Sequence, residues 1–109
     1  MTDPTSQGNA ATFTQLITME IKPEEEQRFL ETAHRGVELV QANEPGVVLY
    51  VLTRHPDRPH TFVWLERYEN EAARERHGSM EYMPGLLTVV RQCLASPPER
   101  LVLEQVEPA

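Results

Sequence analysis

His77 is the residue whose type most directly offers chemistry, because an imidazole titrates near neutral pH and can take up or release a proton. Glu66 carries a carboxylate that could orient this imidazole or balance its charge. Aromatic side chains could wall a cavity for an aromatic ligand or hydrogen-bond its oxygens, and the candidates are Tyr50, Trp64, Tyr68 and Tyr82. Together these are the residue types that could transfer a proton beside a bound aromatic molecule.

A structural explanation is open for each of these residues. His77 could cap or pack a short helix, and Glu66 could pair with a neighbouring arginine at the surface. Trp64 and Tyr50 lie among apolar residues and could pack in the core or in a subunit interface. Only their spatial arrangement decides between the two explanations.

Hydrophobic periodicity predicts the elements that position these residues. Alternation of apolar and polar residues predicts strands, and apolar residues at helical spacing predict helices. In the strand that ends at Tyr68, the residues Phe62, Trp64, Glu66 and Tyr68 share one face. The predicted strands cover residues 12–21, 47–54, 60–68 and 101–106, and the predicted helices cover residues 23–43, 70–78 and 83–94.

Turn and cap residues set the boundaries between these elements. Pro23 suits the first turn of a helix, and Asn70 is a good N-cap for the next one. Glu44-Pro45-Gly46 predicts a helix end, because the residue before proline avoids the helical region and glycine can adopt a positive φ. Gly78-Ser79 predicts a break between the last two helices.

The order strand, helix, strand, strand, helix, strand predicts an α+β fold of ferredoxin-like topology. Such a fold places its helices on one face of a four-stranded antiparallel sheet. The other sheet face is also rich in apolar residues, so we expect a second copy of the chain to cover it in a homodimer. Residues 1–11 are polar and predict a flexible tail, and residues 12–109 predict a single domain.

Composition excludes several classes of partner. The net charge of −7 and the scattered basic residues argue against nucleic acid. No apolar run is long enough for a membrane span and no signal segment is evident, so we expect a cytoplasmic protein. The single cysteine, Cys93, is expected to be a buried hydrophobe, and the spacing of the four histidines gives little support to a metal site.

A family likeness follows from the order of several weak motifs. They are Glu44-Pro45-Gly46 before a strand with Tyr50, the run from Phe62 to Tyr68, Ala72-Ala73, and His77. Across residues 13–106 the sequence resembles the antibiotic-biosynthesis monooxygenase family. The resemblance implies a dimeric α+β barrel with a pocket in each subunit. It also implies oxidation of quinol-like or polycyclic phenolic substrates by O2 without metal or flavin.

The resemblance assigns His77 and Glu66 as catalytic residues, and Trp64, Tyr68, Tyr82 and Tyr50 as substrate-binding residues. An asparagine that carries chemistry in polyketide-quinone-forming relatives is missing, since Trp64 and Tyr68 occupy the corresponding strand positions. Quinol-oxidising relatives often have a second histidine where this chain has Tyr82. No ligand histidine stands near Leu86, so we expect no haem.

Three functions are compatible with the sequence. The first is a cofactor-independent monooxygenase acting on a quinol-like or polycyclic phenol. The second is an isomerase of a small hydroxylated ketone, in which His77 and Glu66 move a proton without oxygen. The third is a dimeric binding module that holds an apolar ligand without turnover. The first is favoured by the resemblance.

Overall fold

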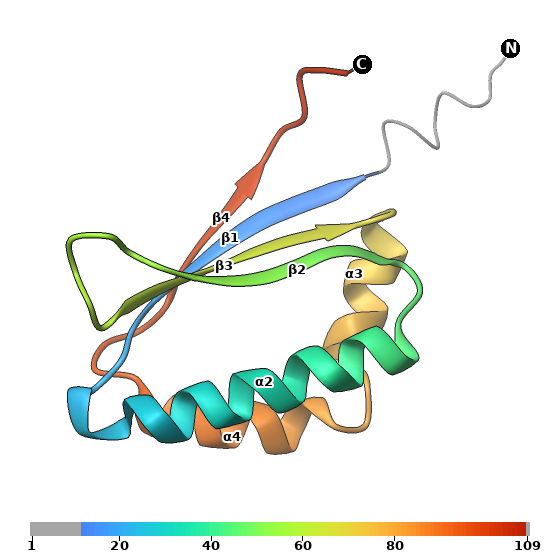
Figure 1. Ribbon diagram of the computed structural model, residues 1–109. Coiled ribbons are helices and arrows are strands. Elements are labelled where there is room, and N and C mark those ends of the chain that lie inside the picture. Colours follow the sequence, from blue (N-terminus) through green and yellow to red (C-terminus); the bar gives the residue numbers. More distant parts are fainter. Residues whose placement is uncertain (1–11, 109) are drawn as a thin grey trace, which may run out of the picture.

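The computed structural model describes residues 12–108, and all its helices lie on one face of an antiparallel sheet (Figure 1). The fold class predicted from the sequence is confirmed, with a sheet that stays open within the single chain. The expected tail at residues 1–11 lies outside the described residues. The elements, in chain order, are β1 (Phe13–Glu20), the 3-10 turn η1 (Pro23–Glu25), α2 (Glu26–Asn43), β2 (Val47–Arg54), β3 (Thr61–Tyr68), α3 (Glu71–Gly78), α4 (Met83–Cys93) and β4 (Glu99–Leu103).

The strand order β2-β3-β1-β4 puts β3 and β1 in the centre of the sheet. Gln15 of β1 and Tyr50 of β2 both pair with Glu66 of β3, so these three side chains share one face. That face packs against the helices. Its core contains Met19, Ile21, Phe29, Ala33, Phe62, Trp64 and Cys93.

Local signals explain most boundaries. Pro23 opens the helical region, and α2 ends at Asn43, as predicted. The Asn70 side chain accepts a hydrogen bond from the Ala73 backbone N–H, which confirms it as the N-cap of α3. Cys93 is fully buried, as expected.

The last strand lies two to three residues earlier than predicted, at Glu99–Leu103 in place of 101–106. Pairing with β1 decides these limits, because Leu103 is opposite Thr14 and Glu99 is opposite Thr18. The apolar run of Leu101, Val102 and Leu103 could not show where the partner strand begins. A boundary set by a distant strand is not encoded locally.

Gly46 follows α2 for a reason different from the expected one. None of the described glycines has a positive φ. Instead, a Cβ built on Gly46 would lie 2.8 Å from the Cβ of Ala73, closer than such atoms approach in proteins. Glycine therefore allows the chain after α2 to pass against α3, the helix that carries His77.

Replacing Gly46 with alanine should destabilise the fold by about 1–3 kcal/mol, because the added methyl group overpacks the contact with Ala73. Denaturant unfolding measures this change. The matched control is Gly85→Ala within α4, where a Cβ meets nothing within 4 Å. That variant should gain up to about 1 kcal/mol from helix propensity. Equal stability of the two variants would contradict the close-contact explanation.

Candidate active site

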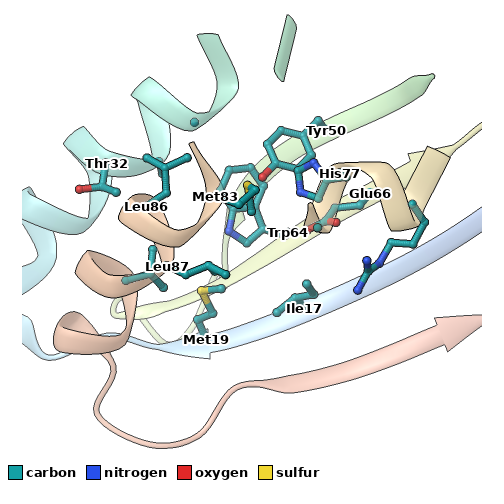
Figure 2. Close-up of a pocket in the computed structure, with 15 residues that line it drawn as sticks. Ile17, Met19, Thr32, Tyr50, Trp64, Glu66, His77, Met83, Leu86 and Leu87 are labelled. Carbon is teal, nitrogen blue, oxygen red and sulfur yellow. The ribbon is translucent and has the colours of Figure 1, made fainter. Parts of the chain in front are cut away.

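A cavity of about 190 Å³ lies between the sheet and the three α-helices (Figure 2). Its wall is mostly aliphatic and aromatic, with a few polar groups gathered around His77 and Glu66. A small number of polar groups in an apolar cavity is the usual composition of a small-molecule site. The lining residues are Ile17, Met19, Thr32, Ala33, Gly36, Tyr50, Trp64, Glu66, Arg74, His77, Gly78, Met83, Leu86, Leu87 and Val90.

His77 is held by a buried carboxylate that the sequence analysis did not identify. Its Nδ1 lies 2.9 Å from Oε1 of Glu44, and both side chains are almost completely buried. An ionised carboxylate only accepts hydrogen bonds, so Nδ1 carries a proton, and in the tautomer with a single ring proton Nε2 keeps its lone pair. Since Glu44 is not among the cavity-lining residues, Nε2 is the ring nitrogen available to a ligand in the cavity.

Tyr82 completes this group by donating its hydroxyl hydrogen bond to the second carboxylate oxygen of Glu44. Glu44 caps α2, His77 lies in α3 and Tyr82 immediately precedes α4. The carboxylate thus ties the three helices together around the imidazole. Two charge-assisted hydrogen bonds to one buried carboxylate hold its geometry more firmly than one would.

Glu66, the predicted partner of His77, belongs to a different network. Its Oε1 accepts hydrogen bonds from Gln15 Nε2, at 2.8 Å, and from the Tyr68 hydroxyl. Gln15 in turn accepts one from Arg100 Nε of β4, at 2.6 Å. Glu66 is 3% exposed and lines the cavity, so it is neither a surface ion-pair residue nor the hydrogen-bond partner of the imidazole.

The aromatic residues divide into two groups. Trp64 and Tyr50 line the cavity and stack on each other, with ring centroids 4.6 Å apart, and Tyr50 meets the His77 ring edge-on at 5.3 Å. Tyr68 and Tyr82 lie outside the lining and hold Glu66 and Glu44 in place. The cavity therefore has an aromatic wall of Trp64 and Tyr50 beside the imidazole, whereas Tyr68 and Tyr82, also expected in the wall, lie in supporting positions.

Burial keeps these tyrosines neutral. Desolvation raises the pKa of Tyr50 well above its ordinary value, and the charges of Glu66 and Glu44 raise it further. Desolvation also raises the pKa of Tyr82, with a further increase from its hydrogen bond to Glu44. Neither phenol ionises near neutral pH, so the basic atoms in the lining belong to the His77 imidazole and the Glu66 carboxylate.

Arg74 is a second residue that sequence reasoning did not select. It lies one helical turn before His77 on α3 and lines the same cavity. Its Nε is buried and has no hydrogen-bond partner in the described chain. Helical spacing from His77 could have distinguished Arg74 from Arg76, which is exposed on the same helix, but it gives no sign that this face of the helix meets a cavity.

Among residues 12–108, no group of three or more His, Cys, Asp or Glu side chains is arranged to hold a metal ion. Within the same residues, no helix is long and apolar enough to cross a membrane.

Comparison with known proteins agrees with this fold. The family model described as antibiotic biosynthesis monooxygenase matches residues 12–88. The chain belongs to the antibiotic biosynthesis monooxygenase family. It is 30% identical over 79 residues to YcnE of Bacillus subtilis (strain 168), named only as a candidate monooxygenase, covering 72% of this chain and 82% of that protein.

Solved structures of similar proteins have the same fold. A Caulobacter crescentus CB15 protein named for this family superposes with a TM-score of 0.86 at 26% identity, covering 90% of this chain and 92% of that one. Rv0793 from Mycobacterium tuberculosis superposes with a TM-score of 0.82 at 18% identity, covering 91% and 99%, and shows the fold alone.

Proposed function

We propose that this protein is a cofactor-independent monooxygenase that oxidises a small quinol-like phenol with O2. One observation carries the proposal: an imidazole, fixed by a buried carboxylate, lines an apolar cavity with an aromatic wall. A base held this way can remove a phenolic proton from a ring bound against Trp64 and Tyr50. Family membership supports the oxidative reaction.

The reaction balances without an external reductant. His77 Nε2 takes the proton of one hydroxyl, and the electron-rich phenolate reduces O2 and forms a carbon–oxygen bond to it. Breaking the oxygen–oxygen bond leaves one oxygen atom on the ring and releases the other as water. A hydroquinone and O2 thus give a hydroxyquinone and water. The apolar wall limits access of bulk water to the charged intermediate.

The volume of the cavity favours a small substrate over a polycyclic one. At about 190 Å³ it exceeds the ~150 Å³ cavity known to hold benzene. It is smaller than the ~300 Å³ at which sites for drug-sized ligands begin. We therefore expect one ring, or two fused rings, in place of the larger polycyclic phenols that the resemblance also allowed.

Oxygen uptake with a panel of hydroquinones and simple phenols tests the proposed function. We expect substrate-dependent consumption of O2, with the product one oxygen atom richer than the substrate. Added catalase should return no oxygen, because water and not peroxide is released. Failure of every phenol in the panel to stimulate oxygen uptake would refute the proposal and leave the isomerase and binding functions.

We also propose that the protein works as a homodimer, closed through the sheet face opposite the helices. Residues paired across all four strands form an apolar row on that face: Val51, Leu65, Leu16 and Leu101. Val51 is 41% exposed and Leu101 57% exposed in the single chain. A contiguous apolar sheet face of this kind is typical of an interface, and a second copy would form the α+β barrel. The cytoplasmic location expected from the sequence stays a prediction.

Replacing Leu65 with lysine should convert the dimer into a monomer, because two lysines would meet near the centre of the apolar face. Light scattering after size-exclusion chromatography measures the mass. The control is Gln41→Lys, an equally charged change at an exposed position on α2. A wild-type protein that elutes as a monomer at micromolar concentration would rule the dimer out.

A further inference from the structure

Two methionine side chains form part of the cavity wall, and the proposed reaction gives them no role. Met19 and Met83 both line the cavity, and each is 8% exposed. Met80, in the segment between α3 and α4, is half-buried and lies outside the lining. Cys93 is also outside the lining. Within residues 12–108, the sulfur atoms of the cavity wall therefore belong to these two thioethers.

Met83 lies at the end of the cavity that holds the imidazole. It begins α4 directly after Tyr82, whose hydroxyl donates to the Glu44 carboxylate. The same carboxylate holds His77. Figure 2 draws Met83 at the end of the cavity where Tyr50 and His77 lie. A ring bound at the imidazole is therefore close to the Met83 thioether.

Met19 lines a more distant part of the wall. It is four residues along β1 from Gln15, which lies opposite Glu66 in the sheet. Glu66 is in turn paired with Tyr50, the residue that meets the His77 ring edge-on. Four residues of strand span about 13 Å. The Met19 thioether is thus distant from a small ring held at His77.

The apolar cavity favours O2 beside these thioethers. Dry apolar cavities in proteins take up apolar molecules, and O2 is a small apolar molecule. In the proposed reaction, O2 first bonds to a ring carbon to give a hydroperoxide, which then loses water. A thioether sulfur is polarisable and is readily oxidised to a sulfoxide. The cavity therefore encloses an oxidant together with a group that it can oxidise.

We propose that Met83 is a modification site, oxidised to its sulfoxide by the hydroperoxide formed from the protein's own substrate. This inference rests on the proposed function and adds a side reaction that limits it. The oxygen–oxygen bond breaks, and the outer oxygen atom bonds to the Met83 sulfur, which loses the two electrons that the peroxide gains. The inner oxygen atom stays on the ring as a hydroxyl. A hydroquinone then leaves as a benzenetriol, in place of a hydroxyquinone and water.

Sulfoxide formation at Met83 inactivates the site. It converts a flexible apolar side chain of the cavity wall into a polar one. A polar oxygen buried without a hydrogen-bond donor is unfavourable, and an aromatic ring loses its apolar contact there. Activity therefore falls with the number of turnovers and not with time alone. Methionine sulfoxide reductase restores the thioether, so the loss is reversible.

Turnover with isotopically heavy O2, in the presence of catalase, tests this inference. Oxygen uptake is recorded on the sample, the chain is digested, and each methionine is examined by fragment mass spectrometry. We expect about five-fold or more heavy sulfoxide at Met83 than at Met19 or Met80. Catalase removes free peroxide, and oxidation during handling adds only the light isotope. Resting protein treated with hydrogen peroxide is the reference and should be oxidised first at Met80, which is more exposed.

Met83→Leu should increase the number of turnovers before inactivation by about three-fold or more, because leucine conserves the volume and cannot form a sulfoxide. Met80→Leu is the matched control outside the cavity lining and should inactivate as the wild type does. Circular dichroism confirms that each variant is folded. The isotope measurement uses the wild type, so it does not depend on either variant.

The two proposals fail differently. Oxygen uptake without heavy sulfoxide at Met83, or with more of it at Met19 or Met80, overturns the modification site and leaves the monooxygenase function intact. Absence of oxygen uptake with every phenol refutes the function, and it refutes the modification site as well because no hydroperoxide is formed.

Discussion

His77→Ala should lower kcat for phenol-dependent oxygen uptake by about 10²–10⁴-fold, the contribution typical of a positioned general base. The variant removes the cavity-lining imidazole and leaves the aromatic wall of Trp64 and Tyr50 in place. The loss should therefore fall on kcat more than on the affinity for the phenol. Steady-state oxygen uptake gives kcat, and anaerobic quenching of Trp64 gives the affinity.

Two further variants sharpen this result. His34→Ala removes an exposed histidine of α2 that does not line the cavity, and it should keep the wild-type rate. Glu44→Gln keeps the shape of the group that holds His77 but removes its charge, and it should lower kcat by less than the loss of the imidazole itself. A wild-type rate in folded His77→Ala would remove His77 from the mechanism.

Raising the pH above about 10 should unfold the protein, and its tyrosines should ionise only as it unfolds. All three tyrosines of the chain have a raised pKa, with burial as the first cause in each. Below their ordinary pKa they are protonated in both the folded and the unfolded state, so stability is unaffected. Above it, only the unfolded chain loses these protons, which favours unfolding.

We expect the free energy of unfolding to fall steeply with pH above about 10. Each phenol that stays protonated in the folded state lowers the free energy of unfolding by up to about 1.4 kcal/mol per pH unit in this range. Phenolate absorbance and far-UV circular dichroism should therefore change together in one cooperative step. Tyr82→Phe removes one of the three chromophores and should reduce the amplitude of that step. Gradual ionisation near pH 10 with an intact dichroism spectrum would show that the tyrosines are not buried around Glu44 and Glu66.

The sequence by itself determined the elements, their order and the face that each strand presents to the helices. Alternation placed Phe62, Trp64, Glu66 and Tyr68 on one side of β3, and the structure buries all four. The N-cap at Asn70 was also predictable from the sequence, because an N-cap side chain bonds to a backbone group only three residues away. These signals are local: they depend on periods of two to four residues, which a single sequence displays directly.

The partners within the site were decided only by tertiary structure. Glu44 and His77 are 33 residues apart, and a motif that signals a helix end gave no indication of a carboxylate holding an imidazole. The sequence analysis predicted that His77 and Glu66 are partners. The pairing register of β1 and β3 instead places Glu66 opposite Gln15, which donates a hydrogen bond to it. Helical spacing places Arg74 on the same side of α3 as His77, but only the packing of α3 against the sheet brings the half-buried Arg74 to the cavity while Arg76 stays exposed. Hydrogen bonds between distant segments depend on how the elements pack, and periodicity carries no information about that packing.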